Sequence, residues 1–424
     1  MRLTKRGPNM TKNIAMCSLA LLVGCSDFWG TYEITDNADA GIVPDLLGST
    51  CERMEPYELI DGVYKTCCDP NDTAKSEINL QKTIDQVQKL SGTAEPTVKI
   101  GCETPRQFTL RRLSADTTIG ETAMLPLIMR STIIDGSGST LDAGLVDRHF
   151  LVKPGVSLTL KNMKLIKGRA TSIPDPTRWP AATDGAVKTT ADAACGGSIL
   201  AFGRLTLVNV FITESRSEHS MLAAGGAICT SGATVALNNS ILFGNSAVAQ
   251  NSGRAEGAAA YFYATNADLY SSTILANINN TTVANGAAAI QFVSAQSKQL
   301  NSYNSLMINY YSLATLQNAS ANYAIYLGCG ASTNIVSTFA FDKMLKGSCM
   351  GGATGVPSSL AISNTGQDWP APTPGPTMIS TSIALDGKLQ LTTDAGVCKA
   401  APLDYFGLPR KASGCMPGAV ELRQ

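Results

Sequence analysis

Apolar and polar positions alternate in several short segments in the middle of the chain. Residues 156–166 read VSLTLKNMKLI, in which Leu158 and Leu160, and then Met163 and Leu165, are separated by one polar residue. A period of two places such side chains on one face of a β-strand. The pattern returns at 205–212 and 234–242, and in weaker form at 269–275 and 303–308. The sequence therefore predicts a series of short strands, each with one buried face.

A second type of strand, made of small residues, precedes these segments. It follows Gly197, Gly226, Gly257 and Gly286, which recur at spacings of 29, 31 and 29 residues. A fixed period of about 20–50 residues is typical of solenoids and propellers. Because no helix-length pattern separates the strands, we predict an all-β fold, a right-handed parallel β-helix over residues 110–345. A WD-type propeller is the alternative, but no Gly-His or Trp-Asp pairs mark the repeats.

Asparagine recurs at matching places in the alternating segments. The matching residues are Asn162, Asn209, Asn239 and Asn304, with Ser272 replacing one of them. Side-chain amides one rung apart in a stack can hydrogen-bond to each other along the axis. We therefore predict an asparagine ladder along one edge of the β-helix.

The two ends of such a stack need covering, because bare strand edges pair with other chains. Leu80, Ile84 and Val87 share one face of a helix expected over residues 77–90, with Gly92 as its stop. Residues 51–109 are therefore predicted to form an N-terminal cap that contains this helix. Residues 346–424 are predicted to form a disulfide-rich C-terminal cap.

The first 24 residues read as an export signal. Arg2, Lys5, Arg6 and Lys12 precede an apolar run at 14–23, which is too short to span a bilayer. The run ends in Leu-Val-Gly-Cys, which resembles the bacterial lipobox, so we expect Cys25 to carry lipid and to anchor the protein in the outer membrane. Met1 and Met10 both fit as the start. Residues 25–50 are acidic and poor in apolar residues, as expected for a flexible tether.

Ten cysteines remain after the signal and Cys25 are set aside. An even number outside the cytosol predicts up to five disulfides. No CxxC pair is present, which argues against a zinc site. The adjacent cysteines at 67 and 68 should have different partners, and a bridge between the last two would close a short terminal loop. The ten are Cys51, Cys67, Cys68, Cys102, Cys195, Cys229, Cys329, Cys349, Cys398 and Cys415.

Composition narrows the classes of function. Lys and Arg number 33 against 33 Asp and Glu, and residues 1–24 hold four of the positive charges and no negative one. The mature chain would have 29 against 33, so there is no basic excess for a nucleic-acid partner. With 44% apolar residues the chain can build a core. Its two histidines leave little room for metal sites, and no metal or cofactor is predicted.

A long insertion at 170–195 breaks the period of the repeat. It carries Trp179 together with Asp175, Arg178 and Asp184. Insertions in solenoids lie on one face, which is often the binding face. A sugar ring could stack on the indole while the polar groups bind its hydroxyls, so this insertion is a candidate glycan-binding site. The other interpretation is a loop without a ligand.

Three segments resemble a known family. They are TIIDGSG at 132–138, RHFLV with GVSLTL at 148–160, and the tail from Cys398 to Glu421. Together they resemble secreted bacterial proteins with a choice-of-anchor Q domain, related to polymorphic outer-membrane-protein repeats. The resemblance implies a pectin-lyase-like β-helix at the cell surface and no shared catalytic residues. The tail departs from the family at Phe406 and at Met416-Pro417, and in place of a C-terminal sorting segment we expect the N-terminal lipid.

Catalytic motifs are not evident. GxSxG, HExxH and GxxxxGK do not occur, and no two repeats carry an acid at the same rung position. We therefore expect a non-catalytic envelope lipoprotein that contacts the membrane through its lipid and binds glycans or other cell-surface partners. A polysaccharide lyase or glycoside hydrolase is the alternative, and a structural surface component is a third class.

Overall fold

The computed structural model describes residues 56–111, 123–173, 193–250 and 253–280, residue 409, and shorter pieces at 288–293, 298–303, 305–309, 323–327, 331–336, 339–340 and 343–347. All of these residues belong to one compact unit, made of residues 48–363 and 391–424. The predicted signal, Cys25 and the tether lie outside the described residues, as does almost all of the predicted C-terminal cap.

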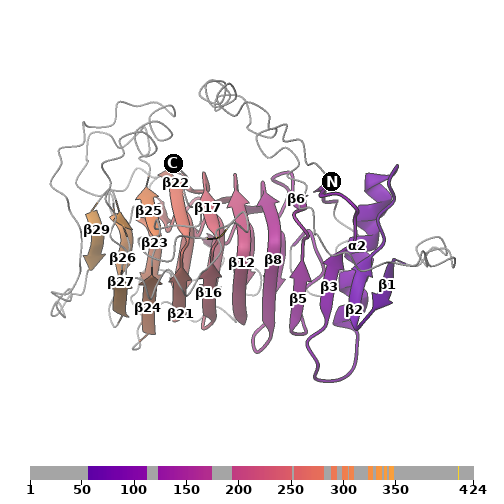
Figure 1. Cartoon of the computed structure of the whole chain (residues 1–424). Helices are drawn as coiled ribbons and strands as arrows, with labels where there is room; N and C mark the ends of the chain where they lie inside the picture. Colours follow the sequence, from indigo (N-terminus) through magenta and orange to yellow (C-terminus); the bar gives the residue numbers. More distant parts are fainter. Residues whose placement is uncertain are drawn as a thin grey trace, which may run out of the picture. The chain divides into compact units, whose positions relative to one another are not determined.

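One coil shows how the repeat is built (Figure 1). It runs through β11 (Ile199–Ala201), β12 (Arg204–Thr213), β13 (Arg216–His219) and β14 (Leu222–Ala224) to β15 (Ile228–Ser231). Strand β15 pairs parallel with β11, on which the coil began. The chain has thus advanced by one rung, about 4.8 Å. The prediction of a parallel β-helix is confirmed.

Several parallel sheets run along the stack, and Figure 1 shows the strands of successive coils in a row. The seven-stranded sheet contains, in spatial order, β7 (Phe150–Val152), β11, β15, β20 (Ala260–Tyr263), β23 (Ala288–Val293), β26 (Tyr323–Leu327) and β29 (Lys343–Gly347). The long sheet contains β2 (Val63–Thr66), β3 (Thr97–Ile100), β5 (Thr132–Asp135), β8 (Ser157–Ile166), β12, β16 (Thr234–Asn238), β21 (Asn266–Tyr270), β24 (Lys298–Tyr303) and β27 (Ala331–Val336).

The long strands bend, and a further stack continues beyond the bend. It joins the ends of β8 and β12 to β4 (Gln107–Thr109), β6 (Thr140–Asp142), β17 (Ile241–Phe243), β22 (Thr273–Asn280), β25 (Leu306–Asn309) and β28 (Phe339–Ala340). Two short stacks complete the coils: β9 (Arg169–Ala170), β13 and β18 (Ser246–Ala249), and β10 (Ala193–Cys195), β14 and β19 (Arg254–Glu256). This parallel pairing from coil to coil excludes a propeller, whose blades are antiparallel.

The core is a set of apolar columns inside the coils. In the long sheet, Leu158 lies beside Leu205, which in turn lies beside Val235, and all three have no exposed surface. Along each strand, the residues that alternate with these buried side chains point outward, as the period of two predicted. Each buried leucine contributes roughly 1.5–3 kcal/mol relative to an exposed one, so one column repeated over many rungs accounts for much of the stability.

The predicted alignment of glycines is wrong by one place beyond Gly226. The register of β11, β15, β20 and β23 separates matching positions by 29, 32 and 30 residues. Gly257 therefore matches Gly196 and Gly225, and all three have positive φ, at 59°, 72° and 56°. Two coils have a Gly-Gly pair at this corner, so the sequence alone did not show which glycine turns the chain. Gly286 lies outside the described residues.

The cap helix begins earlier than its apolar face indicated. Helix α2 (Thr73–Gln88) starts after Asp72, whose side chain accepts a hydrogen bond from the backbone N–H of Lys75 at 2.9 Å. An Asp at the N-cap satisfies one of the N–H groups that the first turn leaves free. Leu80, Ile84 and Val87 are fully buried against the core, as the prediction required.

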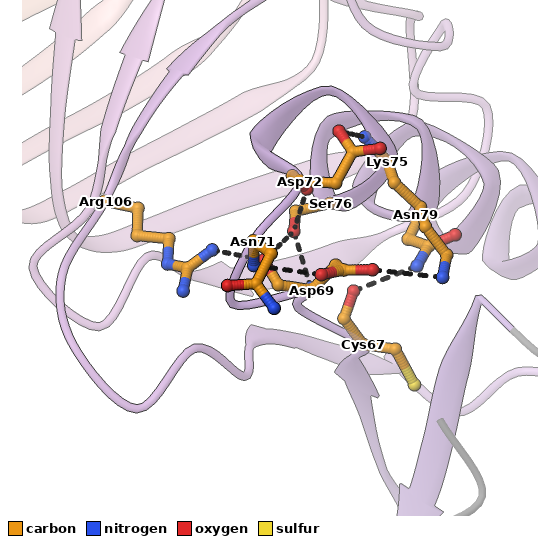
Figure 2. A network of polar contacts seen from close by, with 8 residues as sticks. All are labelled: Cys67, Asp69, Asn71, Asp72, Lys75, Ser76, Asn79 and Arg106. Carbon is orange, nitrogen blue, oxygen red and sulfur yellow. Dashed lines mark hydrogen bonds and ion pairs between the residues drawn. The ribbon is translucent and has the colours of Figure 1, made fainter. Parts of the chain in front are cut away.

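Polar contacts fix the start of α2 to the first coil (Figure 2). Ser76 Oγ accepts from the backbone N–H of Asp69 at 2.7 Å, and Lys75 Nζ donates to Asp69 Oδ2 at 3.1 Å. Arg106, next to β4, donates to the backbone oxygen of Asp69, and Asn79 donates to that of Cys67 at 3.0 Å. These bonds join the helix to strands before and after it, so the cap and the first rungs form one structure. Parallel pairing already begins at β2 and β3, within the segment predicted as cap.

Two disulfides join successive rungs. Cys68 is bonded to Cys102, beside the cap, and Cys195 is bonded to Cys229, between β10 and the outer side of β15. Cys67 is disulfide-bonded as well, so the adjacent cysteines have different partners. The remaining predicted candidates, Cys51, Cys329, Cys349, Cys398 and Cys415, lie outside the described residues.

Candidate functional site

The asparagines form a ladder at the bend of the long strands. Asn239 Nδ2 donates to Asn209 Oδ1 at 3.1 Å, and Asn209 Nδ2 donates to Asn162 Oδ1 at 3.1 Å. The amide of Asn162 donates in turn to Asp135 Oδ1 at 3.3 Å. A carboxylate can only accept, so Asp135 sets the direction in which every amide of the ladder points.

The ladder residues also turn the backbone. Asn162, Asn209 and Asn239 have φ of 51°, 54° and 54°, a region in which asparagine is one of the few tolerated residues besides glycine. The register places Ser271, with φ of 47°, next to Asn239, whereas Ser272 lies next to Ser240. Ser271 is therefore the replacement, not Ser272 as the sequence suggested. Asn304 lies outside the described residues.

Substitution of Asn209 should separate the two roles of the ladder. Asn209→Ala loses both amide bonds and places an alanine at positive φ, and we expect a loss of roughly 2–3 kcal/mol of unfolding free energy. Asn209→Gly loses the same bonds without the backbone penalty and should cost about 1 kcal/mol less. Urea denaturation of both variants checks this. Equal losses would show that the backbone conformation contributes nothing.

A second polar chain runs inside the coils and was not predicted. His149 Nε2 lies 2.9 Å from the carbonyl oxygen of Leu141, which can only accept, so Nε2 carries the proton. The other nitrogen, Nδ1, lies 3.1 Å from Ser198 Oγ, and Ser198 Oγ lies 2.7 Å from Ser215 Oγ. The backbone N–H of Ser215 donates to Asn245 Oδ1 at 3.0 Å.

The chain continues through the next rungs. The side-chain amide of Asn245 donates to Asn277 Oδ1 at 3.0 Å and to the carbonyl of Ile212, also at 3.0 Å. Asn277 Nδ2 donates to the carbonyl of Leu242 at 3.0 Å. Five side chains from four successive coils thus bond to each other and to the backbone. His149 and Ser198 lie just before β7 and β11, whereas Ser215, Asn245 and Asn277 lie just after β12, just after β17 and in the middle of β22.

The Ser198–His149 pair has the spacing of a nucleophile and its base, but its surroundings are those of a structural contact. Both residues have no exposed surface, and burial lowers the pKa of His149 to about 4, so the imidazole is neutral near pH 7. A nucleophile must reach a substrate atom, and nothing in solution reaches this hydroxyl. The pair therefore belongs to the core.

Carboxylates near the strand ends are held by basic neighbours. Lys167 Nζ lies 3.2 Å from Asp142, and Arg169 Nη2 lies 2.7 Å from Glu218. The nearly buried Glu256 is paired with Arg254. A glycosidase needs two carboxyl groups facing one bond at roughly 5–9.5 Å. Within the described ranges no group of three or more His, Cys, Asp or Glu is arranged to hold a metal ion.

Arg148 stands beside the predicted glycan-binding insertion. Its side chain is completely buried, and Nη2 donates to the carbonyl of Ser172 at 2.7 Å while Nε donates to that of Gly196 at 3.4 Å. Ser172 lies near the start of the insertion and Gly196 directly follows its end, so one guanidinium joins its two ends. The predicted site residues Trp179, Asp175, Arg178 and Asp184 lie outside the described residues.

The outward side chains of the long sheet form a broad polar surface, here called the open face. All its members are half-buried or exposed, whereas the residues that alternate with them inside the strands, such as Leu158, Leu207 and Leu269, are buried. The outer side of the seven-stranded sheet differs, because Leu200, Tyr261 and Gln291 on it are at most 5% exposed. The open face comprises Ser157, Thr159, Lys161, Arg204, Thr206, Val208, Thr234, Ala236, Asn238, Asn266, Asp268, Tyr270, Gln299 and Asn301.

Comparison with known proteins gives this chain no relative, since no family model, curated protein or solved structure matches it. The part of the chain that the structure describes contains no helix with the length and apolar character needed to cross a bilayer. Functional inference therefore depends on the β-solenoid itself and on the surfaces it presents.

Proposed function

We propose that this protein is a lipid-anchored envelope protein whose β-helix binds glycans or other cell-surface polymers without cleaving them. The open face is the single observation that supports binding most directly. Each rung from β8 to β24 carries at least one outward hydroxyl or amide group, and successive rungs are about 4.8 Å apart. A polymer with repeated hydroxyl groups would therefore find a hydrogen-bonding partner at every rung. The lipid at Cys25 and the outer-membrane location remain predictions from the signal segment.

The absence of cleavage is supported by the state of the groups that could catalyse it. Asp142, Glu218 and Glu256 each form an ion pair with a lysine or arginine. A glycosidase needs two carboxyl groups that face one glycosidic bond, and these three carboxylates are instead engaged by basic side chains. The buried His149 has no contact with solvent. These observations favour a binding role over the alternative of a lyase or hydrolase.

A glycan array tests the proposal. The full chain with Cys25→Ser, which removes the lipid acceptor, should bind one or more glycans, and the bound glycans should remain intact after prolonged incubation. New reducing or unsaturated ends would favour the enzyme alternative, and no binding to any glycan would contradict the binding role. Labelling with radioactive palmitate is the matched control for the anchor: the unsubstituted chain should take up label and the Cys25→Ser chain should not.

A further inference from the structure

The open face changes in character along the axis. On β8 and β12 the face carries the charges of Lys161 and Arg204. On the preceding rungs, the positions in register with Lys161 are Asp135 on β5 and Lys99 on β3, which are charged as well. From β16 to β24 the outward side chains are amides, the hydroxyl of Thr234, the methyl group of Ala236, the ring of Tyr270 and a single carboxylate, that of Asp268. The second part of the face is therefore nearly uncharged.

The polar groups of this second part are held in place by each other. Asn301 Nδ2 donates to Asp268 Oδ1 at 2.6 Å, so the one carboxylate already has an amide partner on the next rung. Asn266 Oδ1 accepts from the backbone N–H of Gln299 at 3.1 Å. Such bonds restrict the rotamers of these side chains before any ligand arrives, which lowers the entropy lost on binding.

An aromatic ring completes the arrangement. Tyr270 is half-buried and lies directly beside Asn238 in the pairing of β16 with β21, while Asp268 lies two residues earlier on the same side of β21. An aromatic ring offers an apolar surface against which the C–H face of a sugar can pack, and sites for small polar ligands combine such surfaces with a few fixed polar groups. An anionic ligand would instead meet Asp268 without a facing lysine or arginine among the outward residues of β16, β21 and β24.

We propose that the surface formed by Asn238, Asp268, Tyr270 and Asn301 is a binding site for an uncharged polysaccharide. The chain of sugars lies across β16, β21 and β24, with one ring packed on Tyr270 and its hydroxyls bonded to the amides and to Asp268. This inference rests on the proposed glycan-binding function and specifies its site and the class of ligand.

Affinity electrophoresis tests the site. The full chain with Cys25→Ser is run in native gels that contain xyloglucan, glucomannan, mixed-linkage β-glucan or polygalacturonate. We expect at least one of the three neutral polysaccharides to retard it, and Tyr270→Ala to raise the dissociation constant at least tenfold. Tyr270→Phe, which keeps the ring, should retain most of the retardation. Tyr57→Ala, a matched substitution on β1 (Tyr57–Ile60) outside the open face, should leave it unchanged.

The possible results separate this inference from the proposed function. Retardation by polygalacturonate alone would overturn the neutral-glycan site while leaving glycan binding intact. If Tyr270→Ala were retarded as strongly as the chain with Tyr270, the binding site would lie elsewhere on the molecule and the inference would be wrong. If none of the neutral polysaccharides retarded the protein, the inference would also be wrong. The glycan array would then show separately whether the protein binds any glycan, as the proposed function requires. Far-ultraviolet circular dichroism of each variant shows that a loss of binding is not a loss of fold, and Asn238→Ala repeats the test if Tyr270→Ala is unfolded.

Discussion

Arg148→Met should destabilise the protein by about 3–5 kcal/mol, the largest effect that we expect from a single side chain. Arg148 has no exposed surface, and burial lowers its pKa to about 10, so the guanidinium remains charged at neutral pH. Removal of this charge leaves the carbonyls of Ser172 and Gly196 without this donor and leaves the 6% exposed Asp147 without its cationic neighbour.

Urea denaturation at pH 7 measures this loss, with Arg204→Met as the matched control. Arg204 is exposed on the open face, so the same substitution there should change the unfolding free energy by about 0.5 kcal/mol or less. Arg148→Lys keeps the charge but lacks the planar guanidinium that donates to two carbonyls. Its loss of unfolding free energy should therefore lie between those of Arg148→Met and Arg204→Met. A loss below about 1 kcal/mol for Arg148→Met would contradict the role of this residue in joining the ends of the insertion.

The fold was predictable from the sequence because one physical pattern repeats on every rung. The leucines of 156–166 alternate with polar residues, and in the structure Leu158 and Leu160 point inward while Thr159 and Lys161 point outward. The asparagines could be found because the positive φ at the bend and the bond to the next amide both favour this residue. Such signals are local and need no knowledge of the rest of the fold.

The errors and omissions arose where a position depends on distant parts of the chain. Ser271 and Ser272 are adjacent serines, and only the pairing of β16 with β21 shows that Ser271 continues the ladder. His149 and Ser198 are 49 residues apart, with the insertion between them. No sequence period relates them, so their contact could not be predicted. The open face was not predictable from the sequence, because nothing in the alternation shows that the outer side of the seven-stranded sheet is buried.

Acid should weaken the fold through His149. The pKa of this histidine is lowered from 6.5 to about 4, first by burial, against the opposing effects of the bond to Leu141 and the charge of Asp142. The unfolded chain therefore binds a proton between these values and the folded chain does not, so the unfolding free energy falls as pH falls. About 2.5 pH units correspond to about 3 kcal/mol, lost between pH 6.5 and 4.

A comparison of variants isolates this contribution from other titrating groups. Burial raises the pKa of Glu77, so that carboxyl acts in the opposite sense and stabilises the folded state as pH falls. His149→Gln keeps an amide donor for Leu141 and cannot be protonated, so its unfolding free energy should fall by about 3 kcal/mol less than that of the unsubstituted protein between pH 7 and pH 4. If His149→Gln and the unsubstituted protein lost stability in parallel, the buried imidazole would not be the acid-sensitive group. The Ser198–His149 contact would then have to rearrange on protonation without a cost in free energy.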